Sequence, residues 1–301
     1  MESELIRHIR SLPGTGLIGD DAAVIGNQII TVDMLTEGVD FILADTDPQL
    51  IGRKALAVNL SDIAAMGGMP HWIFVAVALP HIGTQTKTLE LAEQLLAGMQ
   101  PLMERYELTL AGGDTNTWDG GLVISITVIG EVTERGVFRR SGGKAGDRIL
   151  VTGPLGGSIL QHQFIFEPRV REALLLNKFY DIHSAIDISD GLTLDLYRLA
   201  TESRLGAALH ESKIPIAAAA HELSQQSGRS PLKHALSDGE DFELLFSVAP
   251  QAAAKLLSEQ PLRSLSGAIL YDIGELTTEP GLRMVMPDGT VQPLTPQGFE
   301  H

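Results

Sequence analysis

The sequence predicts an α/β (α+β) protein of two domains, for three reasons. Short runs of apolar and β-branched residues alternate with longer segments of helical periodicity. The chain has 301 residues, enough for two domains of about 150 residues each. Between residues 133 and 147 the composition becomes glycine-rich and basic, and a new apolar run follows. We therefore predict an N-terminal domain over residues 1–136 and a C-terminal domain over residues 137–301.

The first half is predicted to be rich in strands. The strands are expected over residues 22–26, 28–34, 71–80, 108–114 and 122–132. Helices are predicted over residues 48–66 and about 85–106. In the second of these, apolar residues recur at steps of three and four, but Pro101 lies within the pattern and should kink or divide the helix.

The second half begins with a predicted strand over 148–153, followed by a glycine turn and a helix over 154–166. A further helix is expected over about 190–204, and strands near 206–211, 242–248 and 268–274. The chain contains no Pro-, Ser- or Gln-rich linker, so we expect the two halves to pack against each other.

Composition excludes several classes of function. The formal net charge is −16 and Lys and Arg form no cluster, which argues against nucleic acid as a partner. There is no cysteine, so disulfides and thiolate sites are excluded. The longest apolar run, residues 72–79, is far shorter than the ~20 residues that span a bilayer, and the N-terminus does not resemble a signal peptide. We expect a soluble, cytoplasmic protein that does not bind membranes.

Aspartates recur in one context, at the end of an apolar run beside a glycine or a helix start. They are Asp20, Asp21, Asp33, Asp62, Asp114, Asp187 and Asp190. Any one of them alone is more simply a cap or turn residue. Together they are too many for the nearby Lys and Arg, and two charges ~4 Å apart repel by roughly 4 kcal/mol at a dielectric of 20. Such a set indicates a hard cation, Mg²⁺ before Zn²⁺.

The common nucleotide-binding loops are absent. The segment GGKAGD (142–147) lacks the Ser or Thr that must follow the Walker lysine, and no GxGxxG opens a helix. The glycine turn in VTGPLGGSIL (151–160) suits either backbone binding of a phosphate or close packing of strand and helix. The nine histidines are scattered, and no Ser-His-Asp arrangement can be argued.

Taken in order, several segments resemble the thiamine-monophosphate kinase family, in the superfamily of aminoimidazole ribonucleotide synthetase, selenophosphate synthetase and a hydrogenase-maturation protein. They are GDDAAV (19–24), TVDMLTEGVDF (31–41), KALAVNLSDIAAMGGMP (54–70), GGDT (112–115), RRSGGKAGD (139–147), DISDGL (187–192) and GEDFELLF (239–246). The resemblance implies ATP-dependent phosphorylation of thiamine monophosphate to thiamine diphosphate, with several Mg²⁺ ions. It also implies a mixed N-terminal sheet that pairs in a homodimer, and an ATP cleft between the two domains.

The resemblance also assigns residues. The implied Mg²⁺ ligands are Asp21, Thr31, Val32 (through its backbone), Asp33, Asp62, Asp114, Asp187 and Asp190. The implied ATP contacts are Gly113, Asp114, Arg140 and Ser189, and the implied substrate contacts are Asp40, Glu240 and Phe299. The catalytic group would comprise Asp33, Asp114 and Arg140. Between paired aspartates, Asp21 is the expected ligand and Asp20 supports the loop.

Three positions depart from the family pattern. Asp40 replaces the usual His, Asp238 stands beside Glu240 in SDGED, and GGDTT has become GGDTNT. The first two add negative charge near the expected acceptor pocket. Alternatives are therefore a kinase of this fold with another acceptor, a Mg²⁺-dependent phosphohydrolase, and a non-catalytic nucleotide or metal sensor.

Overall fold

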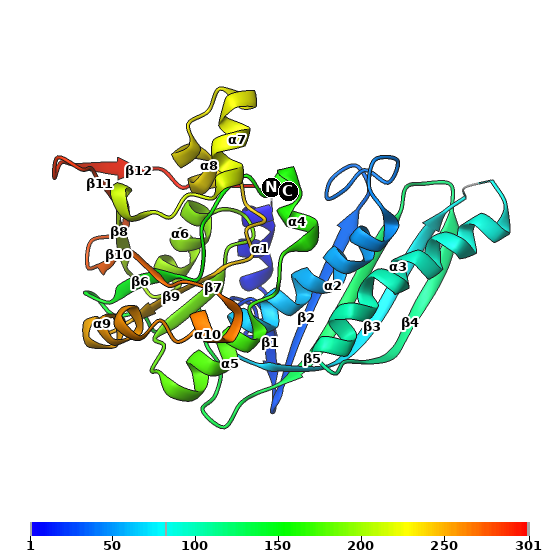
Figure 1. Ribbon diagram of the computed structural model, residues 1–301. Coiled ribbons are helices and arrows are strands. Elements are labelled where there is room, and N and C mark those ends of the chain that lie inside the picture. The colour runs from blue at the N-terminus through cyan, green and yellow to red at the C-terminus, as the bar shows by residue number, and fades with distance from the viewer. Residues whose placement is uncertain (1, 82, 300–301) are drawn as a thin grey trace.

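The computed structural model describes residues 2–81 and 83–299, which form two β-sheets that lie side by side (Figure 1). The first sheet has the order β1-β2-β5-β3-β4 and is antiparallel except between β3 and β4. Its strands are β1 (Ala23–Ile25), β2 (Gln28–Thr36), β3 (Met69–Pro80), β4 (Thr109–Trp118) and β5 (Val123–Glu131). The sheet is therefore mixed, as predicted.

Helices α2 (Pro48–Ala65) and α3 (Gln85–Arg105) cover one face of this sheet (Figure 1). The two helices approach closely at two glycines: a Cβ on Gly52 would lie 2.0 Å from the Leu95 carbonyl oxygen, and one on Gly98 would lie 1.8 Å from that of Gln49. Inward-facing residues of β5, such as Ile124 and Ile126, are buried beneath the helices. The opposite face of the sheet is open and leaves large apolar side chains exposed.

The second sheet has the order β12-β11-β8-β10-β6-β9-β7. Its strands are β6 (Arg148–Val151), β7 (Ser184–Asp187), β8 (Gly206–His210), β9 (Leu244–Val248), β10 (Tyr271–Thr277), β11 (Gly281–Val285) and β12 (Val291–Leu294). The helices of this half are α4 (His162–Ile165), α5 (Val170–Phe179), α6 (Leu192–Glu202), α7 (Ala218–Ser227), α8 (Pro231–Ser237), α9 (Pro250–Glu259) and α10 (Arg263–Ser266), with short 3₁₀ turns η1 (Ser158–Leu160) and η2 (Glu211–Lys213).

Helix α2 joins the two halves, because it contacts α4, α5 and β7 as well as its own sheet. Arg53 on α2 donates hydrogen bonds to the backbone oxygens of Phe164 and Phe166. The N-terminal helix α1 (Glu2–Arg10) is tied to α6 by an ion pair between Arg10 and Glu202. The expectation that the halves pack against each other is thus confirmed. The connection from β5 to β6 contains the proposed boundary at residues 136 and 137, which stays a prediction.

Two predicted helices differ from those observed. Pro101 lies inside α3 without dividing it, because proline removes only one backbone hydrogen bond and the buried Leu95, Met99 and Leu102 hold the helix against its neighbours. The helix expected over 154–166 is wrong. That segment forms only η1 and α4, because Gly156 and Gly157 adopt positive φ and Gln161 between the two turns has a φ of 140°. Across the described ranges, no helix has both the length and the apolar character needed to cross a membrane.

Candidate metal and nucleotide site

Three aspartates from distant parts of the sequence converge where the two halves meet. Asp21 precedes β1, Asp62 lies on α2, and Asp187 ends β7. One carboxylate oxygen of each lies within 4.8 Å of the others. This cluster, called the carboxylate cage below, brings together three of the predicted metal ligands.

Strand β2 and helix α2 orient the side chains around the cage. Thr31 and Asp33 are two residues apart on β2, so both point toward α2. Thr31 donates a hydrogen bond to Asp62, and the backbone N–H of Asp33 donates to Asn59 Oδ1 at 3.1 Å. From the same helix, Ser61 Oγ donates to Asp187 Oδ2 at 2.5 Å. Asn59 and Ser61 were not predicted as site residues. Polar residues within an otherwise apolar helical segment could have indicated them.

The cage concentrates negative charge in a buried place. Burial, followed by the nearby charge of Asp40, raises the pKa of Asp33 to about 6. Burial and neighbouring carboxylates also raise the pKa values of Asp62 and Asp187 well above the usual range of aspartate. Asp21 Oδ2 is buried and has no hydrogen-bond partner within the described part of the chain. Carboxylate oxygens and a threonine hydroxyl form a donor set that fits Mg²⁺.

Asp20 and Asp21 make different contacts with the two neighbouring arginines. Arg140 Nη2 donates to Asp21 Oδ1 at 2.7 Å. Asp20 instead accepts from the Arg140 backbone N–H at 2.9 Å and from Arg139 Nη1 at 2.7 Å, which fixes the loop. Arg140 is thus placed beside the cage, with its guanidinium largely buried.

Asp190 and Asp114 lie outside the cage. Asp190 is paired with Arg198, and its backbone N–H donates to Asp195 Oδ2 at 2.9 Å. Asp114 lies on the edge strand β4 and is paired with Ala76 of β3. Ala76 is paired with Ser125 of β5, which is paired with Met34 of β2, so these four side chains lie on the same face of the sheet. Asp114 therefore faces the open side of the sheet, whereas Asp33 faces α2.

The remaining predicted residues are placed as follows. The Val32 side chain points outward and is exposed, which leaves only its backbone for a ligand. Gly113 lies against β3, where a Cβ would come within 1.9 Å of the Val75 carbonyl oxygen. The Ser189 carbonyl accepts from the Glu240 N–H at 2.7 Å, and the Phe299 N–H donates to the Asp190 carbonyl at 3.0 Å. The 187–190 segment thus connects the cage to Glu240 and Phe299, two of the three predicted substrate contacts.

The glycine turn after β6 serves packing and internal hydrogen bonding. The Gly156 N–H donates to Asp241 Oδ1 at 2.8 Å, and the Gly157 N–H donates to Asp238 Oδ2 at 3.3 Å. A Cβ on Gly157 would lie 2.4 Å from the Ala219 carbonyl carbon. Of the two interpretations that the sequence left open, these contacts favour packing over phosphate binding.

Asp238, one of the departures from the family pattern, belongs to a separate network. Its carboxylate contacts Arg229 Nη1 at 3.2 Å and the buried His234 Nδ1 at 2.7 Å. The other ring nitrogen, His234 Nε2, lies 2.7 Å from Ser227 Oγ. The resulting Ser-His-Asp chain could not be predicted from the sequence. The ion pair with Arg229 offsets the charge of Asp238.

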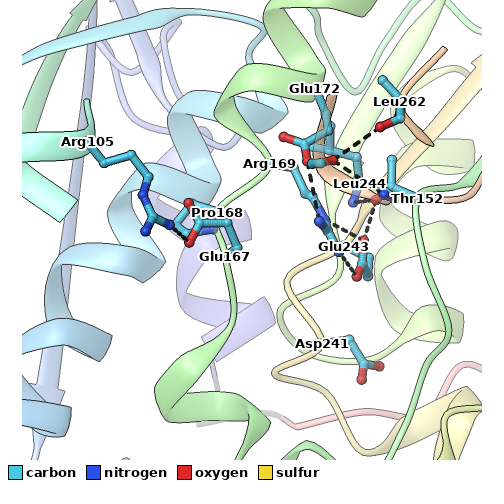
Figure 2. Close-up of polar contacts among 12 residues, drawn as sticks. Arg105, Thr152, Glu167, Pro168, Arg169, Glu172, Asp241, Glu243, Leu244 and Leu262 are labelled. Atoms are coloured by element: carbon cyan, nitrogen blue, oxygen red, sulfur yellow. Dashed lines mark hydrogen bonds and ion pairs between the residues drawn. The ribbon is translucent and has the colours of Figure 1, made fainter. Parts of the chain in front are cut away.

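A buried ion pair anchors the segment that carries Glu240 (Figure 2). Arg169 donates hydrogen bonds to the Glu243 carboxylate from Nε and Nη2, and the Thr152 hydroxyl donates to the same carboxylate. Figure 2 also shows Asp241, whose Oδ2 is buried and unpartnered within the described residues. Burial raises the pKa of Asp241 to about 8.

These carboxyl groups should make the metal-free protein less stable as the pH rises. The folded pKa values of Asp33, Asp195 and Asp241 are raised to about 6, 7 and 8. The folded state therefore holds protons that the unfolded chain releases near pH 4, and this contribution to stability is lost between about pH 4 and pH 8. Thermal melts in EDTA should show a Tm several degrees lower at pH 8 than at pH 5, since each kcal/mol shifts Tm by about 2–4 °C. Millimolar Mg²⁺ should reduce this fall, and a Tm that rises steadily across the range would contradict the charge assignment.

Comparison with known proteins covers the whole chain. Residues 19–132 match the N-terminal domain of the AIR synthase related proteins, and residues 144–287 match their C-terminal domain. The thiamine-monophosphate kinase of Rhodopirellula baltica is 39% identical over 318 residues, covering 100% of this chain and 97% of that protein. A solved structure described as "AaThiL complexed with AMPPCP and TMP" has a TM-score of 0.86 at 26% identity and covers 100% of this chain and 96% of the other. The thiamine-monophosphate kinase of Stenotrophomonas maltophilia K279a has a TM-score of 0.75 at 31% identity, with 95% of each chain covered.

These similarities extend over both sheets and confirm the predicted fold class. The match to the Rhodopirellula baltica protein spans the whole chain, including the segments that carry the cage and Arg140. The chain therefore belongs to the thiamine-monophosphate kinase family.

Proposed function

We propose that the protein transfers the γ-phosphoryl group of ATP to the phosphate of thiamine monophosphate and releases thiamine diphosphate and ADP. The observation that carries the proposal is the convergence of Asp21, Asp62 and Asp187 beside the Arg140 guanidinium. Support comes from curated thiamine-monophosphate kinases that are 30–39% identical, and from the related structure that holds AMPPCP, an ATP analogue, together with TMP.

The proposed chemistry needs charge neutralisation more than proton transfer. The acceptor phosphate is already ionised near neutral pH, so no strong general base is required. The cage and Asp33 would hold Mg²⁺, which would supply positive charge to offset the repulsion between the two anionic substrates. Arg140 carries a positive charge beside Asp21. Once a cation binds the Asp21 carboxylate, the guanidinium is free to bind a substrate phosphate instead.

A product assay tests the proposal directly. The protein is incubated with ATP, Mg²⁺ and thiamine monophosphate, and the products are separated by chromatography. Equal amounts of thiamine diphosphate and ADP support the kinase. ADP and free phosphate without thiamine diphosphate would show a hydrolase, and an absence of turnover would show a sensor or another acceptor. Thiamine without its phosphate is the matched control acceptor and should give no diphosphate.

We also propose that the protein acts as a cytoplasmic homodimer, paired through the open face of the first sheet. This face carries Val32 and Met34 on β2, each 63% exposed, and Trp72 and Phe74 on β3, with β5 between the two strands. Exposed apolar side chains on an open sheet face are typical of a protein interface. This surface and the family resemblance support the dimer.

Phe74→Lys is expected to give a folded monomer, because it places a charge in the middle of the proposed interface. Size-exclusion chromatography with light scattering should show half the wild-type mass, and activity should fall at least about tenfold. Leu89→Lys is the matched control, since Leu89 is exposed on α3 away from that face. It should leave both mass and activity unchanged. A dimeric, active Phe74→Lys protein would refute this interface.

A further inference from the structure

Lys54 on α2 is a fully buried cation with a complete set of partners. Its side chain is 0% exposed, and its Nζ lies 2.5 Å from Glu240 Oε1. It also donates to Gln163 Oε1 at 2.7 Å and to the Asp40 carbonyl at 2.9 Å. An ammonium group has three N–H donors, and all three are used here. A lysine is almost never fully buried unless it is paired, so the surroundings are built around this charge.

The three acceptors come from three separate segments. Asp40 lies in the loop after β2, Gln163 is on α4, and Glu240 lies between α8 and β9. The first belongs to the first half of the chain and the others to the second. Lys54 therefore ties together the two segments that carry the predicted acceptor contacts Asp40 and Glu240.

The backbone around Glu240 is held in an unfavourable conformation. Glu240 and Phe242 have φ values of 55° and 49°, which are costly for residues other than glycine. Hydrogen bonds to the 187–190 segment hold this backbone, and the ion pair of Glu243 anchors its end. Only the Glu240 side chain is then left to be oriented, and the contact with Lys54 does this.

Lys54 and Glu240 differ in what they can reach. The Glu240 side chain is 33% exposed, whereas that of Lys54 has no exposed surface. A ligand can therefore touch the carboxylate but not the ammonium. Burial raises the pKa of Glu240, Lys54 lowers it, and the charges of Asp40 and Asp190 raise it further. The pKa of Glu240 stays above its ordinary value, and Lys54 is the cation that opposes this rise.

We propose that Lys54 is a positioning residue that holds the Glu240 carboxylate in one orientation, where it binds the cationic heteroaromatic ring of the phosphoryl acceptor. This proposal rests on the proposed function. The attraction between an oriented carboxylate and a thiazolium cation would contribute to acceptor binding and not to ATP binding. Lys54 would therefore act on affinity for the acceptor only through Glu240.

A double-mutant cycle tests this dependence. Wild type, Lys54→Met, Glu240→Gln and the double variant are compared for KM of each substrate and kcat. Binding of thiamine monophosphate without ATP is measured by calorimetry. We expect Lys54→Met to raise the acceptor KM at least about tenfold and to leave the ATP KM within about twofold. The double variant should bind the acceptor no more weakly than Glu240→Gln alone.

Arg53→Met is the matched control. Arg53 is the neighbouring cation on α2 and bonds to the Phe164 and Phe166 carbonyls of the same α2–α4 contact, at 3.0 Å for Phe164, without touching Glu240. Its loss should lower Tm but change the acceptor KM less than about twofold. An equal rise in acceptor KM for Arg53→Met would show a general structural effect and overturn the proposal.

Additive losses in the cycle, or an equal rise in both KM values for Lys54→Met, would also overturn it. If Lys54→Met does not fold, the comparison of Glu240→Gln with the double variant decides, because the double variant leaves no unpaired charge. The proposed function fails separately, if the wild-type protein forms no thiamine diphosphate. The calorimetric cycle would then still show whether Lys54 acts through Glu240 on binding of a thiazolium compound.

Discussion

Asp62→Asn is expected to abolish Mg²⁺-dependent turnover while making the metal-free protein more stable. Asp62 lies between Asp33, Asp187 and Asp21, and the charges of all three raise its pKa. An amide has nearly the same shape and can still accept the hydrogen bond from Thr31. It removes one of the mutually repelling charges, but it is a poor ligand for Mg²⁺. We expect kcat/KM to fall at least about 1,000-fold, a loss of roughly 4 kcal/mol of transition-state stabilisation.

The gain in stability distinguishes a metal site from a structural cluster. In EDTA at pH 8, the Tm of Asp62→Asn should exceed that of wild type by several degrees, because fewer protons offset the carboxylate charges than at pH 5. At pH 5 the two should melt closer together, because protonation already removes part of the repulsion in wild type. Added Mg²⁺ should raise the Tm of wild type much more than that of the variant.

Asp47→Asn is the matched control for this experiment. Asp47 caps the same helix α2 at its other end, where its side chain accepts from the Gln49 N–H at 2.9 Å. Asparagine caps helices about as well as aspartate, so stability, Mg²⁺ response and activity should stay close to wild type. Near-normal activity in Asp62→Asn would refute the assignment of the cage as the metal site.

The sequence predicted those features that depend on local patterns. Alternating apolar residues predicted the strands of the first sheet. Strand β4 differs in that it extends to Trp118, beyond the predicted end at residue 114. Aspartates at the ends of apolar runs pointed to the cage, although Asp62 lies near the C-terminal end of α2 and not at a helix start. The helix expected over 154–166 failed because positive φ angles at Gly156 and Gly157 produce a turn that packs against α7 and α8.

Other features depend on contacts between distant residues, which no local pattern reveals. The partners of Lys54 lie 109 residues away at Gln163 and further still at Glu240. Asp238, in contrast, is bound by residues close to it in the sequence, His234 and Arg229, which makes it part of an internal network. Adjacent charges in the sequence therefore need not share a pocket.

Mixing two inactive variants, Asp62→Asn and Asp114→Asn, is expected to restore activity. Asp114 faces the open side of the first sheet, whereas the cage lies beneath the opposite face. Strands β2 and β4 are also three strand spacings apart, or roughly 14 Å. One chain alone therefore does not bring Asp114 to its own cage. If Asp114 binds nucleotide or metal as the family resemblance implies, the homodimer would supply it from the partner's edge strand β4 and not from the same chain.

The size of the restored activity follows from symmetry. Each variant alone lacks one group in both sites and should lose at least about 100-fold in activity. After exchange of subunits in equal amounts, about half of the dimers are mixed, and one of their two sites combines an intact cage with an intact Asp114. Activity should therefore return to about a quarter of wild type, measured as thiamine diphosphate formed per chain.

The control combines both substitutions in one chain and mixes it with wild type. Mixed dimers of this pair have no doubly intact site, so activity should drop below that of the wild-type fraction alone and return to it when exchange is prevented. Recovery in the first mixture with no drop in the second would contradict a shared site. An absence of recovery, with dimers confirmed by light scattering, would show that Asp114 acts within its own chain and would contradict a shared site. The cage would then depend only on residues of its own chain.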